Sequence, residues 1–198
     1  MNILLKFKNH FTRSGSVGRA WTEALLYSNE DRLVFEENDA ELVIIYGCGP
    51  GNRAHYMRAR ERGLPTITID LGFWQRGGPR DTDAHYKVSV NWHHPQQYLM
   101  QLNCPPDRFK KFNRGSKEPT PWHNTGRQIL LAGMGPKSFE LYDMRSQEWD
   151  LWAVEEIRKR TERPIIYRPK PSWLNPQPIP GTIFSSKHQN LDAVLNNT

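Results

Sequence analysis

The chain contains little cysteine and lacks any long apolar segment. Its 198 residues include only two cysteines, Cys48 and Cys104, which lie far apart and form no C-x-x-C pair. This number and spacing exclude a disulfide framework and a cysteine-rich zinc site, so two free thiols are expected. No apolar run approaches the ~18 residues that cross a membrane, and no cleavage site follows the opening residues. We therefore expect a cytoplasmic protein without a leader or a membrane span.

The basic residues are scattered and form no long Lys/Arg run. The formal net charge is +6, from 27 Lys and Arg against 21 Asp and Glu. A basic balance suits polyanions such as nucleic acid, nucleotide phosphates or acidic membranes, and a solvated basic surface explains it equally well. Seven tryptophans are present. They could stack on bases, although we expect most of them to pack in the core or in a linker.

Strands followed by glycine-rich loops predict an α/β fold. The clearest strand is LVIIY at 42–46, which is apolar on both faces, as central parallel strands are. A glycine loop, a helical segment over 52–62 and a second strand, TITID, ending at Asp70, follow it. Such strand–loop–helix–strand units build doubly wound sheets. We predict Rossmann-like parallel sheets with flanking helices.

The same pattern occurs again later in the chain. Residues 127–132 predict a strand, followed by the loop GMGPKS, an amphipathic helix over 149–160 and a strand in PIIYR. We predict an N-terminal domain over 1–115, a polar linker over 116–126 and a C-terminal domain over 127–198. The second domain has too few units for a complete Rossmann-like domain, so we expect it to be incomplete.

Further elements are expected in the first domain. A strand is predicted near 2–7, and a helix is predicted to start after Ser16, which could serve as its N-cap. The segment HYKVSVNW, 85–92, predicts another strand. Residues 95–112 are expected to be irregular or weakly helical.

The segment from Gly47 to His55 is a candidate ligand-binding loop. Ligands of open α/β sheets bind outside the carboxyl ends of strands, where helix N-termini present unpaired N–H groups. The spacing is not G-x-G-x-x-G, and a tight turn that needs a positive φ is the competing interpretation. The candidate residues of this loop are Gly49, Gly51, Asn52, Arg53 and His55.

Two acid–base candidates lie at or just after the ends of strands in the first domain. Asp70 could act as a general base or cap the next turn, and Arg76 and Arg80 behind it could contact a phosphate. On a strand, the adjacent His93 and His94 would point to opposite faces and would not chelate one metal. One of them could serve in acid–base chemistry, or both could only form hydrogen bonds. We expect no metal site.

Basic residues follow both strands of the second domain. The loop GMGPKS combines backbone N–H groups, a lysine and a serine, which suit a diphosphate, but it lacks the P-loop spacing. The next strand ends in RPKP. Because the carboxyl ends of parallel strands meet at one edge of a sheet, we expect the two loops to converge there. Solvent-exposed charge at loop tips is the alternative. The candidate residues are Gly133, Gly135, Lys137, Ser138, Arg168 and Lys170.

The order of these motifs resembles phage-encoded glycosyltransferase-like proteins of the two-domain GT-B type. The resemblance covers nearly the whole chain and rests on YGCGPGNRAHYMRARERGLPTITIDLGFW, HYKVSVNWHHP, ILLAGMGPKS, IIYRPKPSW and SSKHQNLDAVL. It implies transfer of a sugar from a nucleotide-sugar to a hydroxyl. The acceptor would bind the first domain and the nucleotide-sugar the second. Acceptors of such proteins include hydroxymethylated bases in phage DNA and surface polysaccharides.

The resemblance also implies residue roles. Asp70 or His93 would be the base, the loop 47–55 would face the acceptor, and the second-domain loops would hold the nucleotide and its diphosphate. No covalently bound cofactor is implied. In such proteins LDAVL leads into further strands, so we expect a C-terminally short chain, which a partner chain could complete. The alternative is a non-catalytic protein of the host-cell cytoplasm that binds DNA or a host protein on the same scaffold.

Overall fold

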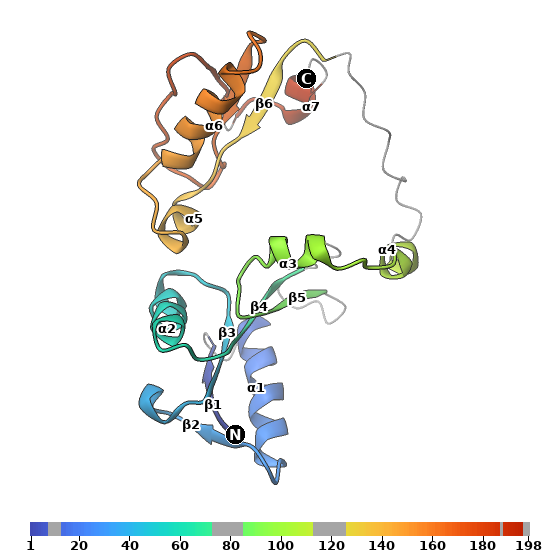
Figure 1. Ribbon diagram of the computed structural model, residues 1–198, viewed down its shortest axis with the longest axis vertical. Coiled ribbons are helices and arrows are strands. Elements are labelled where there is room, and N and C mark those ends of the chain that lie inside the picture. Colours follow the sequence, from blue (N-terminus) through green and yellow to red (C-terminus); the bar gives the residue numbers. More distant parts are fainter. Residues whose placement is uncertain (8–12, 73–84, 113–125, 187, 196–198) are drawn as a thin grey trace. The chain divides into compact units, whose positions relative to one another are not determined.

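The computed structural model contains two compact units, Met1–Ser116 and Lys117–Thr198, called unit 1 and unit 2 below (Figure 1). Unit 1 has a mainly parallel sheet and unit 2 a parallel one, each with flanking helices, which confirms the predicted α/β class. Arg76, Arg80 and the predicted linker 116–126, except for Gly126, lie outside the described residues. The structure describes residues 1–7, 13–72, 85–112, 126–186 and 188–195.

Unit 1 is built on a five-stranded sheet with the order β2-β1-β3-β4-β5. Strands β1 to β4 are parallel, and β5 pairs antiparallel with β4 at one edge. The chain passes from β1 outward to β2 and then continues on the other side of β1 through β3 and β4. The strand order therefore reverses between β1 and β3, which is where open α/β sheets place their ligand crevice. The strands are β1 (Asn2–Lys6), β2 (Arg32–Val34), β3 (Leu42–Tyr46), β4 (Thr66–Leu71) and β5 (Tyr86–Val90).

Helices cover both faces of this sheet. Helix α1 (Arg13–Leu26) packs on the face that carries Ile3, Ile44 and Ile69, and α2 (Pro50–Glu61) buries Tyr56 and Ala59 against the other face. Because α1 begins at Arg13, the predicted N-cap at Ser16 is wrong. The close approach of α1 depends on Gly18, where a Cβ would lie 2.9 Å from the ring of Phe7. Three short helices complete the unit, η1 (Glu37–Asp39), α3 (Gln96–Gln101) and α4 (Asp107–Phe112).

Unit 2 has a three-stranded parallel sheet with the order β6-β7-β8. Its core is formed by residues of β6, β7 and α6, among them Leu131, Val154, Ile165 and Tyr167. The glycine loop after β6 runs directly into a short helix, α5, which the sequence pattern did not predict. The elements are β6 (Ile129–Ala132), α5 (Pro136–Leu141), α6 (Glu148–Arg158), β7 (Ile165–Arg168), β8 (Ile183–Phe184) and α7 (Leu191–Leu195). In the described parts of both units, no helix is long and apolar enough to cross a membrane.

Candidate functional site

The loop after β3 is closed by a side chain from α2. Asn52 lies in the first turn of α2, is buried, and donates from Nδ2 to the carbonyl oxygens of Tyr46 (2.8 Å) and Lys6 (3.3 Å). These two carbonyls end β3 and β1. Gly47 has a φ of +66°, and its N–H donates to Ile69 O (2.7 Å). The tight-turn interpretation therefore holds for Gly47, and the Asn52 amide is engaged by backbone.

The rest of this loop faces solvent or another part of unit 1. A Cβ at Gly51 would meet no atom within 4 Å, and Gly49 is the N-cap of α2. The Nδ1 atom of His55 contacts the carboxylate of Glu37 in η1, and Arg58 donates to the same carboxylate over 2.6 Å. The bond from Arg58, followed by that from His55, lowers the pKa of Glu37 to about 2 against the opposing effect of burial. His55 thus holds η1 onto α2.

A polar cluster lies on one face of β4 and β5. Thr68 and Asp70 point to the same face of β4 because residues two apart on a strand share a face. The antiparallel register sets Thr68 opposite Ser89 and Asp70 opposite Lys87. Thr68 and Ser89 are buried, whereas Asp70 and Lys87 are half-buried. The carboxyl end of β4 therefore carries a carboxylate beside an ammonium.

The chain turns back after β5 and brings His93 onto this cluster. The carbonyl oxygen of His93 accepts from Lys87 Nζ (2.8 Å), and its N–H donates to Tyr56 Oη (3.3 Å). His93 Nε2 lies 3.7 Å from Asp70 Oδ2. The two acid–base candidates therefore meet. The expectation that His93 and His94 point to opposite faces is wrong, because both follow β5 in a turn and their ring centroids are 4.3 Å apart.

Burial decides the charge of His93. The pKa of His93 is lowered to about 4, first by burial and then by Lys87 and His94, while Asp70 opposes the shift. The imidazole is therefore neutral at neutral pH. Its buried Nδ1 has no hydrogen-bond partner among the described residues. Because Nε2 faces the Asp70 carboxylate, we assign the imidazole proton to Nε2.

Lys87 is the member of this cluster that the sequence pattern missed. Its Nζ also lies 3.3 Å from His94 Nδ1. Burial lowers the pKa of Lys87, and the charge of Asp70 opposes that shift. Burial, with a smaller effect of Asp70, raises the pKa of Cys48 to about 12, so this thiol is neutral at neutral pH. Cys48 and Cys104 are both free, the first buried and the second exposed.

The glycine loop of unit 2 packs against a buried polar network. A Cβ at Gly133 would lie 2.8 Å from Cε2 of Tyr167. Tyr167 Oη donates to Asp150 Oδ2 (3.1 Å), and the N–H of Met134 donates to Asp150 Oδ1 (3.0 Å). Asp150 is fully buried, and burial raises its pKa against the effect of these two hydrogen bonds. This packing requires glycine at position 133.

The two basic loops of unit 2 contact each other at Gly135. A Cβ there would lie 2.7 Å from Cδ of Lys170, so the lysine side chain covers the glycine loop. The guanidinium of Arg168 donates to Ser185 Oγ (3.0 Å) and to Gln189 O (2.9 Å). Lys170 therefore reaches across from the end of β7, while Arg168 ties β7 to the segment that follows β8.

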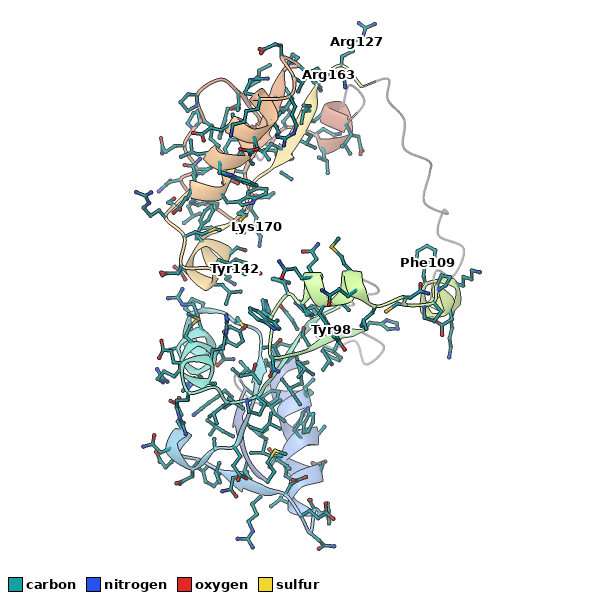
Figure 2. The ribbon with its side chains drawn as sticks, viewed as in Figure 1. Tyr98, Phe109, Arg127, Tyr142, Arg163 and Lys170 are labelled. Atoms are coloured by element: carbon teal, nitrogen blue, oxygen red, sulfur yellow. The ribbon has the colours of Figure 1, made fainter. Side chains whose placement is uncertain are left out.

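A pocket of about 400 Å³ is lined by Lys170 and the segment that follows it. Figure 2 labels Lys170 in unit 2. This volume lies in the range of small-molecule sites. The Trp173 ring forms one wall and packs edge-on against Phe139, with ring centroids 5.5 Å apart. Lys137 and Ser138 lie in the first turn of α5, outside the pocket walls. The walls include Pro169, Lys170, Trp173, Gln177, Phe184 and His188.

Another pocket, of about 410 Å³, lies in unit 1 between α1 and the strands β1 and β2. It is lined mainly by apolar side chains, including Phe7 and Phe35, with Lys6 and Arg19 at its polar wall. Asp70 and His93 do not line this pocket. It is therefore separate from the acid–base cluster.

The fold places this chain among Rossmann-like α/β proteins, with polar side chains gathered at the carboxyl ends of the strands in each unit. No family model and no curated protein matches the sequence. Among solved structures, the chain is similar to KpsC of Thermosulfurimonas dismutans, described as a beta Kdo 2,4 transferase. The two share 15% identity with a TM-score of 0.38, over 85% of this chain and 60% of that chain. The present chain thus matches about three-fifths of the length of that protein chain.

Proposed function

We propose that the protein is a glycosyltransferase-like enzyme that moves a sugar from a nucleotide-sugar to a hydroxyl group. The observation that carries the proposal is the meeting of Asp70 and His93 at the carboxyl end of β4, 3.7 Å apart. One hydroxyl oxygen can lie within hydrogen-bond distance, ~2.8 Å, of both groups at once. A carboxylate and a neutral imidazole in this arrangement can orient and deprotonate an acceptor.

In this proposal Asp70 is the base and His93 is a hydrogen-bond donor. A His93 pKa of about 4 makes the imidazole neutral but a weak base. Asp70 Oδ1 accepts from the N–H of Leu71 (2.7 Å), which leaves Oδ2 to take the proton. The acceptor oxygen loses that proton as it bonds to the anomeric carbon. The bond from that carbon to the nucleotide diphosphate breaks, and the diphosphate leaves with the electron pair.

The nucleotide-sugar is proposed to bind unit 2. Trp173 offers a flat aromatic wall for a base, and Lys170 offers an ammonium at the pocket. The loop from Gly133 to Ser138 is proposed to bind the diphosphate mainly through the charge of Lys137, because the N–H groups of Gly133, Met134 and Ser138 already donate within unit 2. Arg168 would support this site indirectly, because its guanidinium is engaged by Ser185 and Gln189. For the acceptor we propose a hydroxyl of modified phage DNA or of a surface polysaccharide.

A ligand panel tests this proposal. UDP-, GDP- and ADP-sugars are titrated while the thermal unfolding midpoint is followed, since a ligand that binds only the folded state raises this midpoint by mass action. We expect one nucleotide to raise the midpoint, and Lys170→Met to weaken its binding about tenfold. Lys159→Met is the matched control, because Lys159 is exposed and pairs with Glu156 away from the pocket. If every donor leaves the midpoint unchanged at millimolar concentration, the proposal fails.

A second candidate function is nucleic-acid binding without catalysis. The guanidinium of Arg60 lies 4.5 Å over the ring of Trp92, which is 53% exposed. Such a pair offers a stacking surface and a positive charge to a strand. Salt-dependent DNA binding that Trp92→Ala weakens and Trp152→Ala does not would support it; Trp152 is 54% exposed in unit 2. Absent or salt-insensitive binding would exclude it.

A further inference from the structure

Lys87 contacts both His93 and His94, which lie in the turn after β5, yet the reaction described above gives Lys87 no role. Its Nζ lies 2.8 Å from the carbonyl oxygen of His93 and 3.3 Å from Nδ1 of His94. The register of β4 and β5 sets Asp70 opposite it. An ammonium has three protons to donate and no acceptor. Two acceptors and a carboxylate therefore surround one fixed cation.

We infer that Lys87 is a positioning residue. Its ammonium holds His93 and His94 against β5, and in this way it fixes the orientation and favours the neutral form of the His93 imidazole that faces Asp70. Two longer bonds also hold His93, at 3.4 Å from Ser89 Oγ to His93 O and 3.3 Å from His93 N to Tyr56 Oη. A role of Lys87 in catalysis rests on the proposed function, whereas its contacts with His93 and His94 are independent of that function.

The electrostatic consequence follows from the groups around His93. Burial is the largest influence against a positive charge on the imidazole, Lys87 and then His94 add to it, and Asp70 favours the charge. Cys48, which interacts with Lys87 and Asp70, is a neutral thiol and brings no charge. A cation that also donates to His94 Nδ1 makes this nitrogen an acceptor, which places the His94 proton on Nε2. Among the groups that act on His93 in the described residues, Lys87 is the one lysine or arginine, beside His94 and Asp70.

Histidine titration by nuclear magnetic resonance tests the inference on the whole chain. The wild-type His93 midpoint is expected at about 4, and Lys87→Met is expected to raise it by the share that Lys87 contributes, while burial, the larger cause, keeps it below the ordinary 6.5. Lys87→Arg keeps a cation and is expected to keep the midpoint low. Lys110→Met, an exposed lysine of α4, is the matched control and is expected to change nothing. A midpoint that stays near 4 in Lys87→Met overturns the inference.

A second measurement needs no variant, so it decides the question even if Lys87→Met does not fold. The nitrogen shifts of neutral His94 in the wild type report which nitrogen carries the proton. The Nε2–H form is expected, because Lys87 donates to Nδ1. A wild-type His94 protonated on Nδ1 would contradict the hydrogen bond from Lys87 to this nitrogen, and with it the positioning role.

These readouts separate the inference from the proposed function. A raised His93 midpoint in Lys87→Met, together with no sugar transfer from any donor, removes the proposed function and leaves the role of Lys87 in place. Sugar transfer by the wild type, together with an unchanged His93 midpoint in Lys87→Met, supports the proposed function and removes the positioning role of Lys87. If both hold, Lys87→Met moves the acid limb of the kcat/KM profile to higher pH, because the neutral imidazole is then lost sooner as the pH falls.

Discussion

The side-chain amide of Asn52 donates to the carbonyl oxygen of Tyr46 over 2.8 Å. The same nitrogen reaches the carbonyl oxygen of Lys6 at 3.3 Å, so one residue of α2 satisfies backbone acceptors at the ends of both β3 and β1. Sheets of this kind open a crevice between the strands where the order reverses. Here the side-chain amide of Asn52 binds the last carbonyl oxygen of each strand that flanks this crevice, β1 and β3. The acid–base pair of Asp70 and His93 lies one strand further on, beyond β3 at the end of β4.

Replacing Asn52 by alanine is expected to destabilise unit 1 by about 1–3 kcal/mol, because two carbonyl acceptors lose their donor in a buried place. Urea unfolding followed by circular dichroism measures the change. Asn29→Ala is the control, since Asn29 is exposed in the turn before β2, and it should leave the midpoint unchanged. Equal stability of the Asn52 variant and the wild type would show that the two bonds contribute nothing net.

Two glycines of the candidate loops should respond to alanine in opposite ways. At Gly133 the new Cβ would press on the Tyr167 ring at 2.8 Å. Because Asp150 and Gln147 hold that ring in place, we expect a loss of about 1–3 kcal/mol. At Gly51 the Cβ enters open space inside α2, and we expect a gain of about 0.5–1 kcal/mol. Thermal unfolding of both variants measures this pair, and a stable Gly133→Ala would contradict the packing argument.

Stability should rise with pH between about 4 and 6.5 on account of His93. In the unfolded chain this histidine titrates near 6.5 and in the folded chain at about 4, so the unfolded state binds more protons in this window. Lowering the pH through the window should cost on the order of 3 kcal/mol at ~1.4 kcal/mol per pH unit. His94 acts in the same direction, because burial lowers its pKa as well.

Urea unfolding at a series of pH values measures this slope, and His93→Asn should flatten it. Glu37 is a separate contribution. Its pKa of about 2 against the ordinary 4.5 supplies stability that is present above 4.5 and is lost as the pH falls toward 2. A wild-type slope unchanged by His93→Asn would mean that His93 titrates normally in the folded protein.

Asp70→Asn should separate catalysis from donor binding. An amide cannot take the acceptor proton, so turnover is expected to fall about 10²- to 10⁴-fold. The affinity for the nucleotide-sugar should stay unchanged, because the proposed donor site lies in unit 2. Initial rates and calorimetric titration of the same preparation measure both quantities. Full turnover by the Asp70→Asn variant would remove Asp70 as the base and leave the donor site to be judged separately.

The sequence alone determined the α/β class, because its causes are local. An apolar run such as 42–46 is long enough only for a strand covered on both faces, and glycines mark the turns that follow. Asp70 and His93 could be selected for the same reason, since Asp70 lies at the carboxyl end of a strand and His93 follows the next strand. The start of α1 at Arg13 and the short helix α5 could not be predicted, because they depend on tertiary packing, of α1 on the sheet and of Phe139 in α5 on Trp173.

Only the tertiary structure decided that these candidates form a site. The antiparallel register of β5 sets Lys87 opposite Asp70, and the turn after β5 reverses His93 and His94 onto the same cluster. Strand register and chain reversal follow from contacts between distant residues, which no local spacing records. The neutral state of His93 has the same origin, because burial by segments far apart in the chain outweighs the charge of Asp70.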